Sequence, residues 1–574
     1  MDAAAYDASS VLIVGAGPTG LAAAMSLARA RIPVRLIDKA MQPAPYSRAI
    51  GIQARTLELL EQHRLVEPFL ELGHRARIAN LVSNGMRLAQ LDFDPLHTRY
   101  PYLLFLDQSI TERLLTEHLA TLGVTVERGV ELTSFSQGAA SVQATLRRAD
   151  GHTESARPSY MIAADGAHSM IRHRLGMSFA GRTFEQTFLL ADLHAETDWP
   201  DDEFHIFASG EGLVALFPLG HGRHRLIADQ AVESAAAPAT LTPAVLGEPP
   251  LNQVPPPSLD QCRTLIGRRV HERVDVSDLA WSSYFHVNSR MVERLRVGRI
   301  FFAGDAAHVH SPAGAQGMNT GIQEAFNLGW KLARVINGAA PDRLLDTYHL
   351  ERHPIEREVL RQTGFMTQMA EADHGPLKLL RERVMPVLAA LGPLRDAARL
   401  TISELSVQYR RSPLTLERVL DGGPRAGERA PDALVHVVDG PLGRAPGVGC
   451  IFDLHDPAFF SLFLLVPPLP VDGTPLDPAA THRVAPETEL DRLTGEVERL
   501  LPGAVRIWRI TDTTGEGGPS LAESYGRTRP SFYLVRPDGY ISARGRTGSD
   551  LHGLLRHCEA WFAVGGEIRE QAAL

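Results

Sequence analysis

Cysteine is scarce in this chain of 574 residues, which contains three. Cys262, Cys450 and Cys558 lie far apart in the sequence, and no Cys-x-x-Cys pair occurs. Isolated cysteines do not make a disulfide framework. The scarcity therefore excludes a disulfide-linked fold and indicates free thiols in a reducing compartment.

Runs of basic residues are missing as well. Lys and Arg number 58 against 67 Asp and Glu, which gives a formal net charge of -9 at pH 7. A mildly acidic chain without a basic run lacks the positive potential that attracts nucleic acids or anionic membranes. Neither is therefore expected as a main partner.

One apolar stretch, residues 11–30, resembles a signal peptide or a membrane helix. Its upstream flank carries acidic residues and no basic one, unlike the flank of a signal peptide. Its interior is broken by glycines and a proline, which suit a turn better than a membrane span. We expect no targeting segment and no membrane partner, and hence a cytoplasmic protein. The interrupting residues are Gly15, Gly17, Pro18 and Gly20.

The same glycines form the turn of a strand–turn–helix–strand unit. An apolar run precedes Gly15-x-Gly17-x-x-Gly20, a helical pattern follows, and a second strand ends at Asp38. Such glycines let the backbone approach a pyrophosphate, which the helix N-terminus then faces. An acid after the second strand accepts the hydroxyls of an adenosine ribose. The unit predicts a dinucleotide site and does not separate NAD from FAD. Its further candidates are Pro18, Thr19 and Lys39.

Residues 163–172 contain a second strand-to-helix turn. Asp165 and Gly166 end an apolar run, and Ser169 and Arg172 open a helix. Asp and Gly are the default residues of turns, so an ordinary turn explains the pattern as well as a ligand site does. From the residues alone both explanations stay open.

A third turn of this kind follows the apolar run 299–303. Gly304 and Asp305 end the run, and Gly314 and Gly317 precede a long helix. Two helix N-termini behind glycine loops suit the two ends of one long ligand, such as FAD. Asp305 would hold the ribityl or pyrophosphate segment. The second helix would face the flavin ring, whose reduced, negative form an exposed helix N-terminus favours by about 0.3–1 kcal/mol.

The third turn also contains His308 and His310, which raise the question of a metal site. A protein metal site needs three or four ligands in suitable geometry, and no further cluster of ligands stands out in the sequence. We therefore predict no metal. Both histidines are expected to pack within the loop and to hydrogen bond with the backbone.

The pattern of predicted helices and strands changes along the chain. The length of the chain fits two to four domains. Alternating segments with glycine turns between about 180 and 290 predict antiparallel sheet, and the Ala/Pro-rich stretch 235–257 predicts a surface loop. Residues 345–410 are mostly helical. Residues 421–433 predict a turn-rich entry to a last domain, which contains a hairpin turning at Asp538 and Gly539.

Together the three turns resemble the single-component FAD-dependent aromatic hydroxylases, or group A flavoprotein monooxygenases. The resemblance rests on GAGPTG at 15–20, on Asp165-Gly166, and above all on the block 304–333. It covers residues 8–350 and is nearest to the branch that hydroxylates phenols or polyketide aromatics. "YLVRPDGYISARG" near the C-terminus resembles the thioredoxin-like domain of many such enzymes. Without Cys-x-x-Cys, disulfide exchange is not expected there.

The resemblance implies an α/β fold in three parts. A Rossmann-type FAD-binding domain is interleaved with an antiparallel-sheet substrate domain, and a C-terminal thioredoxin-like α/β domain follows. The implied divisions are 1–180 and 281–410 for the FAD-binding domain with its following helical segment, 181–280 for the substrate-binding domain, and 411–574 for the C-terminal domain.

The family pattern also implies where the cofactors bind. Non-covalent FAD occupies the three turns, and NADPH or NADH visits transiently, since no second Rossmann unit is visible. Gly15, Gly17 and Gly20 take the pyrophosphate, and Asp38 takes the ribose. The other implied contacts are Arg48 and Gln108 beside the pyrophosphate and ribityl chain, Asp165 for flavin and reductant, Gly304 and Asp305 for the ribityl or pyrophosphate, Pro312 beside the ring, and Gly317, Met318 and Asn319 toward the pyrimidine end.

The implied reaction is the hydroxylation of an aromatic ring. NADPH reduces FAD, O2 forms a C4a-hydroperoxide on the reduced flavin, and its distal oxygen is transferred to the ring. Water must be excluded, and the phenol reacts best when ionised. Pro312 and Arg48 are the implied catalytic positions beside the flavin. Tyr284, His286 and Arg225 are candidates for ionising the phenol, with an ordinary sheet residue as the alternative for each.

Two other functions fit parts of this pattern. A flavin-dependent reductase, dehydrogenase or oxidase would use the same turns on an aromatic or quinone substrate without inserting oxygen. A non-catalytic binding scaffold would show no flavin turnover. The sequence names neither the substrate nor the oligomeric state, for which a homodimer is one option.

Overall fold

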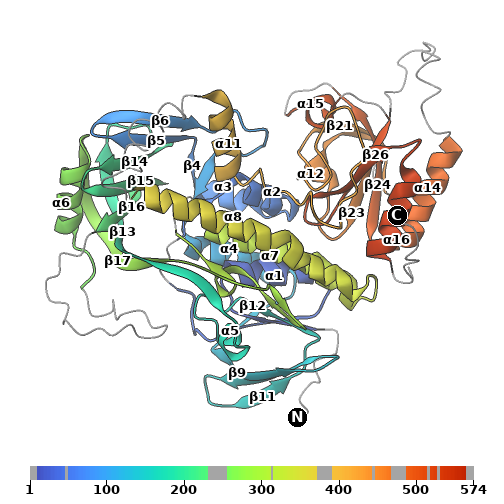
Figure 1. Ribbon diagram of the computed structural model, residues 1–574, viewed down its shortest axis with the longest axis horizontal. Coiled ribbons are helices and arrows are strands. Elements are labelled where there is room, and N and C mark those ends of the chain that lie inside the picture. Colours follow the sequence, from blue (N-terminus) through green and yellow to red (C-terminus); the bar gives the residue numbers. More distant parts are fainter. Residues whose placement is uncertain are drawn as a thin grey trace.

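The chain folds into three parts arranged in a row. Figure 1 shows a central α/β domain between an eight-stranded sheet at one end and the C-terminal domain at the other. Side chains are described except at 185, 186, 230, 366–370 and 487–489. The computed structural model describes residues 10–44, 49–230, 255–311, 315–370, 391–441, 446–466, 487–513, 518–526 and 530–563.

A six-stranded, mostly parallel sheet lies at the centre of the first part. β1 (Val11–Val14) pairs in parallel with β2 (Val34–Asp38) and with β12 (Tyr160–Ala163). All of β1 is buried in the core of the central domain, which explains its continuous apolar run. The predicted Rossmann-type domain is thereby confirmed. The order is β18-β19-β12-β1-β2-β8, with β18 (Arg296–Val297), β19 (Ile300–Phe302) and β8 (Val126–Arg128).

Two helices of the central domain lie side by side and run in the same direction. α1 (Pro18–Arg29) and α7 (Gly317–Ile336) approach closely through small residues. A Cβ atom on Gly321 would lie 2.2 Å from Oγ1 of Thr19, and one on Gly329 would lie 2.2 Å from Oγ of Ser26. Thr19 lies in the first turn of α1 and Gly321 follows the first turn of α7, so both N-termini open to the same side.

The eight-stranded sheet includes strands outside the segment of about 180–290 for which antiparallel sheet was predicted. Its long strands β13 (Phe179–Thr197) and β17 (Val274–Val292) pair antiparallel, and α6 (Leu259–Arg269) covers one face. β17 crosses the predicted boundary at 280–281, and segment 78–92 adds two strands. The order is β20-β17-β13-β16-β15-β14-β5-β6, with β20 (His308–Val309), β16 (Arg223–Gln230), β15 (Gly212–Gly220), β14 (Glu203–Ser209), β5 (Ile78–Ser83) and β6 (Met86–Asp92).

The C-terminal domain contains a six-stranded mixed sheet with helices packed on it. β25 (Ser531–Val535) and β26 (Ile541–Arg546) form the predicted hairpin around Asp538 and Gly539. A thioredoxin-like character of this domain stays a prediction. The order is β22-β21-β24-β23-β25-β26, with β22 (Gly447–Cys450), β21 (Leu434–Asp439), β24 (Val505–Asp512) and β23 (Phe460–Leu465), and the helices are α12 (Ile451–Leu454), α14 (Glu487–Leu500), α15 (Leu521–Tyr525) and α16 (Leu551–Phe562).

Two small sheets and several helices complete the described fold. The sheets are β3 (Gly51–Ile52), β7 (Leu103–Phe105) and β4 (His74–Ala76), and β11 (Thr153–Ala156), β10 (Val142–Arg148) and β9 (Val130–Gln137). The helices are α2 (Ala54–Gln62), α3 (Val66–Leu72), α4 (Gln108–Thr121), α5 (Met170–Arg174), α8 (Asp346–Ala370) and α11 (Gly392–Ile402), with 3-10 turns η2 (Gly304–Ala306) and η3 (Asp342–Leu345).

Several segment predictions can be compared with these elements. The described parts of 345–410 contain α8 and α11 and no strand, as expected. Most of the Ala/Pro-rich stretch, up to residue 254, lies outside the described residues. Among the helices that the structure describes, none combines the length and apolarity of a membrane span.

Candidate active site

The three glycines of the first turn have different tasks. Gly15 has a φ of +104°, and a Cβ there would lie 2.1 Å from the carbonyl oxygen of Ala164. A Cβ on Gly20 would lie 1.9 Å from the carbonyl oxygen of Gly15, so close packing requires this glycine. A Cβ on Gly17 would meet no described atom within 4 Å. Gly17 thus leaves an opening that suits the close approach of a ligand.

The N-termini of α1 and α7 both lack a side-chain cap among the described residues. α1 begins after Gly17 with Pro18, and α7 begins after Gln316. The first N–H groups of a helix have no acceptor within the helix, and they carry partial positive charge. Two such N-termini on one side of the domain fit FAD, with its pyrophosphate near α1 and its electron-rich ring near α7.

Asp38 ends β2 and holds the first turn in place. Its carboxylate accepts hydrogen bonds from the N–H groups of Ala16 and Ala40, each at 2.8 Å. Arg128 lies 3.4 Å from the same carboxylate. The ribose contact of Asp38 stays a prediction, as does cofactor binding by the exposed Lys39.

The second turn contacts the first and favours a ligand site. Ala164, which packs against Gly15, precedes Asp165. Oδ2 of Asp165 accepts a hydrogen bond from the N–H of Ile171 at 3.3 Å. Burial raises the pKa of Asp165, and its buried Oδ1 has no hydrogen-bond partner among the described residues. Since buried acceptors are rarely left unpaired, a ligand explains this oxygen better than an ordinary turn does.

The third turn is joined to the first through Thr19. Gly304 has a φ of +59°, and a Cβ there would lie 2.5 Å from Oγ1 of Thr19. The side chain of Thr19 therefore packs between the third turn and α7. Asp305 is exposed, and its cofactor contact stays a prediction. Pro312 and Arg48, the implied catalytic positions beside the flavin, lie outside the described residues.

Asn319 links the start of α7 to the segment before α2. Its Nδ2 donates to the carbonyl oxygen of Gly51 at 2.8 Å, and its Oδ1 accepts from the N–H of Gln53 at 3.0 Å. The side chain is thus engaged within the protein, which is consistent with a flavin contact through the backbone alone. The neighbouring predicted residues in the first turn of α7 are Gly317 and Met318.

His308 does more than pack within the loop. Its ring donates from Nε2 to Glu324 at 2.8 Å, and the same carboxylate accepts from the N–H of Gly304 at 2.8 Å. Burial lowers the pKa of His308, but the Glu324 carboxylate outweighs burial and raises that pKa to about 9. His310 matches the expectation, because its ring contacts the Ser311 carbonyl at 3.0 Å and burial lowers its pKa to about 4.

His308, Glu324 and Glu356 form a buried group whose ligand atoms lie within 4.8 Å of one another. Arg352 lies 3.9 Å from the Glu324 carboxylate, and its charge opposes a divalent cation there. Burial, and then the Glu324 charge, raise the pKa of Glu356 well above its ordinary value, which favours the neutral form of Glu356 beside Glu324. We therefore keep the prediction of no metal.

Tyr284 and His286 lie on the face of the eight-stranded sheet that α6 covers. Tyr284 pairs in register with Leu189, and both pack in the apolar cluster beneath α6. His286 stands two residues further along β17 and shares this face. The pleat thus directs both candidates away from the three turns, which argues against their role in ionising a phenol.

Arg225 lies on the opposite face, toward the central domain. Its Nε and Nη2 donate to the buried Asp192 at 2.7 and 2.6 Å. Nη2 also donates to Asp107, directly before Gln108, at 3.1 Å. Trp281 donates to Asp192 at 2.7 Å. Of the three phenol-ionising candidates, the fold therefore directs Arg225 to the site.

Three of the acidic residues described above, Glu324, Asp107 and Asp192, were not predicted from the sequence. Glu324 is the single charged residue between 317 and 330, in a helix stretch that is buried throughout from 318 to 333. An acid in such a stretch needs a buried partner, and this signal was available in the sequence. Asp107 and Asp192 gave no comparable signal, because their contacts with Arg225 depend on strand register.

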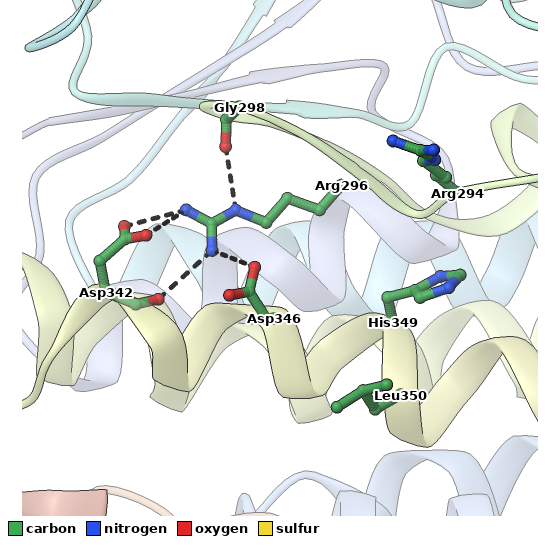
Figure 2. Close-up of a pocket in the computed structure, with 7 residues that line it drawn as sticks. All are labelled: Arg294, Arg296, Gly298, Asp342, Asp346, His349 and Leu350. Atoms are coloured by element: carbon green, nitrogen blue, oxygen red, sulfur yellow. Dashed lines mark hydrogen bonds and ion pairs between the residues drawn. The ribbon is translucent and has the colours of Figure 1, made fainter. Parts of the chain in front are cut away.

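A cavity of about 450 Å³ lies at the edge strand β18, away from the three turns. Figure 2 shows Arg296 directed at Asp342, Asp346 and the carbonyl oxygen of Gly298. These charges neutralise one another, and β19 and β12 separate β18 from β1. The cavity therefore has no part in the candidate site.

Comparison with known proteins identifies the family. Residues 8–363 match the family described as an FAD binding domain. The chain belongs to this family of FAD-dependent aromatic hydroxylases. The hydroxylase is 34% identical over 555 residues to 6-methylpretetramide 4-monooxygenase of Streptomyces rimosus, which covers 94% of this chain and 91% of the relative. It is 31% identical over 566 residues to pentachlorophenol 4-monooxygenase of Sphingobium chlorophenolicum, with 95% of each chain covered.

A solved structure shows the same architecture. The anhydrotetracycline hydroxylase from Streptomyces rimosus has a TM-score of 0.71 at 28% identity, covering 96% of this chain and 99% of that chain. The hydroxylase is thus a FAD-dependent aromatic monooxygenase that uses O2 and a reduced nicotinamide, as the resemblance implied. The roles of its individual site residues stay predictions.

Replacing Gly17 separates cofactor binding from folding. The side chain of Gly17→Val enters the opening in the first turn, where its Cβ would meet no described atom within 4 Å. We expect an unchanged melting temperature of the apoprotein and an FAD Kd raised at least about tenfold, or ~1.4 kcal/mol. Gly20→Ala is the contrasting variant, since its Cβ clash lowers the melting temperature itself. Wild-type FAD affinity in Gly17→Val would contradict the assignment of this opening.

The His308–Glu324 pair makes stability depend on pH. The folded pKa of His308 is about 9, above its ordinary 6.5, so between these values the folded chain keeps a proton that the unfolded chain has lost. The stabilisation is therefore complete below pH 6.5 and is lost as the pH rises through 9, an effect of about 1–3 kcal/mol. The free energy of unfolding, measured with urea, should fall between pH 6.5 and pH 9. This fall should be smaller in His308→Asn.

The matched control for this prediction is His310→Asn. Burial lowers the pKa of His310 to about 4, so this ring is neutral throughout that window and its loss leaves the decline in place. A decline that survives in His308→Asn, or disappears in His310→Asn, would show that other groups cause it.

Proposed function

We propose that the hydroxylase acts on a phenolic, polycyclic aromatic substrate held between the flavin and the eight-stranded sheet. The relatives named for 6-methylpretetramide and pentachlorophenol, each aligned over more than nine-tenths of this chain, support an aromatic substrate. The observation that carries the proposal is the pair of parallel helices α1 and α7, whose N-termini have no side-chain cap within the described part of the chain, together with an apolar sheet face.

The residues of the three turns hold the cofactor and exclude water from it. Gly17 admits the pyrophosphate, and the N-terminus of α7 favours negative charge on the ring. Glu324 and His308 fix the Gly304 turn, so the cofactor meets a preorganised backbone. Bound FAD supplies the chemistry that couples a reduced nicotinamide to O2. The oligomeric state, with a homodimer as one option, stays a prediction.

The sheet face toward the central domain supplies the substrate contacts in this proposal. Phe188 and Phe285 stack there with ring centroids 5.6 Å apart, next to the buried Leu190. Aromatic and aliphatic side chains suit a flat ring system. Arg225 lies on the same face and acts as a positioning residue, since it orients Asp192 and, through it, Trp281. Asp192 and Asp107 balance its charge, so Arg225 acts on the substrate through the side chains that it positions.

Isotope labelling distinguishes oxygen insertion from other flavin chemistry. With purified holoenzyme, NADPH oxidation should accelerate when a polycyclic phenol is added, and one atom from 18O-labelled O2 should appear in the product. Labelled product in the mass spectrum supports the hydroxylation of this substrate class. Turnover of the same phenols without incorporated label would identify a reductase or oxidase instead.

Two substitutions on opposite faces of the sheet test the substrate face. Arg225→Lys cannot bridge Asp192 and Asp107 as the planar guanidinium does, so kcat/KM should fall at least about tenfold. Tyr284→Phe changes the face beneath α6 and should leave kcat/KM as in the wild type. An equal loss in both variants, or none in Arg225→Lys, would show that this face does not contact the substrate.

A further inference from the structure

The C-terminal domain inserts a charged turn into the central domain. Arg536 and Asp538 flank the tip of the β25–β26 hairpin and are 1% and 3% exposed. Arg536 donates two hydrogen bonds to the carboxylate of Glu351 in α8, at 2.6 and 3.0 Å. Lys331 of α7 donates to the same carboxylate at 2.7 Å. The buried charges balance, because two cations face the carboxylates of Glu351 and Asp538.

Asp538 connects this turn directly to α7. Its Oδ2 accepts hydrogen bonds from Asn327 at 3.1 Å and from the indole of Trp330 at 3.2 Å. Asn327 also donates to Glu351 at 2.8 Å. These bonds fix where α7 lies relative to the turn, because each donor is itself fully engaged in the buried network.

The same turn also contacts α2. Arg55, which is fully buried, donates from Nη2 to the carbonyl oxygen of Asp538 at 2.9 Å, and its guanidinium lies 4.6 Å from the centre of the Tyr540 ring. Gly539 has a φ of +73°, and a Cβ there would lie 2.8 Å from the side-chain amide of Gln62. The turn therefore packs against α2 at both ends of that helix, through Arg55 and Gln62.

α2 and α7 both begin at the cofactor site. Asn319 in the first turn of α7 bonds to Gly51 and Gln53, which precede α2 directly. Asn327 and Trp330 lie further along the same helix, where the turn holds them. A shift of α7 against α2 would therefore strain the Asn319 bonds and move the helix N-terminus that faces the flavin.

We propose that the 536–539 turn of the C-terminal domain is a positioning element of the FAD site. It fixes α7 against α2 and thereby holds the α7 N-terminus and the Gly51–Gln53 segment in the geometry that binds the cofactor. The proposal rests on the assigned FAD-dependent function. In this proposal the C-terminal domain contributes to cofactor binding. That role needs no disulfide exchange, and so needs no Cys-x-x-Cys pair.

An apolar interface would dock the two domains without this turn. Trp330, Ala340 and Leu344 of the central domain already pack with Phe460 and Phe562 in one buried cluster. Burying four charges adds little to the strength of such an interface, but it admits one geometry, since any shift leaves a charge unpaired. This directional constraint is what a positioning element requires.

The test compares full-length variants at two places on the same domain interface. Asp538→Asn keeps the shape of the turn and weakens its bonds to Arg536, Asn327 and Trp330. Asp453→Asn is the matched control, because it removes a half-exposed ion pair with Arg64 between the same domains, at 3.4 Å. FAD Kd is measured by titrating each apoprotein with FAD and following flavin fluorescence, and melting temperatures are measured in parallel.

We expect Asp538→Asn to raise the FAD Kd at least about tenfold, while Asp453→Asn stays within about twofold of the wild type. Trp330→Phe removes the indole N–H that bonds to Asp538 but keeps an aromatic ring between Phe460 and Phe562, and it is the second variant if Asp538→Asn does not fold. It should raise the FAD Kd by about threefold with an unchanged fold by circular dichroism.

Wild-type FAD affinity in a folded Asp538→Asn or Trp330→Phe variant, even with a lowered melting temperature, would overturn the proposal. So would an equal loss of affinity in Asp453→Asn. Because the readout is FAD affinity, a wild-type protein that binds FAD without hydroxylating phenols would refute the proposed substrate class and leave this test intact.

Discussion

The close contact of α1 with α7 is the constraint on which the site depends. Thr19 fits where Gly304 and Gly321 have no side chains, and Ser26 fits against Gly329. A larger residue at any of these glycines would separate the helices. Because the two helices run in parallel, their positive ends face the same side, and two turns far apart in the sequence together favour one anionic ligand.

Buried charge secures this arrangement at two levels. Near the cofactor, Glu324 joins the N–H of Gly304 to the ring of His308, so a helix side chain holds the turn before it. Further along α7, Lys331 donates to Glu351, and Arg536 of the C-terminal domain donates to the same carboxylate. Each group is costly to bury alone, and together they select a single packing of the helices.

The fold was predictable wherever the signal was local. The glycine turn at Gly15, the buried run of β1 and the hairpin at Asp538 follow from backbone freedom and apolar patterning. The predicted boundary at 280–281 falls within β17, one strand of 19 residues, because strand length depends on the partner strand. Segment 78–92 gave no sign that it pairs with strands more than a hundred residues away, since such pairing is non-local.

The sequence by itself determined the family and the three turns, because glycine placement and the 304–333 block reflect local backbone demands. Tertiary structure decided which side chains lie on the sheet face toward the central domain. The pleat and the strand register place Tyr284 and His286 beneath α6 and place Arg225 on the opposite face. His308 gained a buried carboxylate partner in Glu324, whereas the His310 ring contacts the backbone carbonyl of Ser311. The sequence gives the type of each side chain. Its partners, and hence its protonation state and role, depend on contacts that only folding creates.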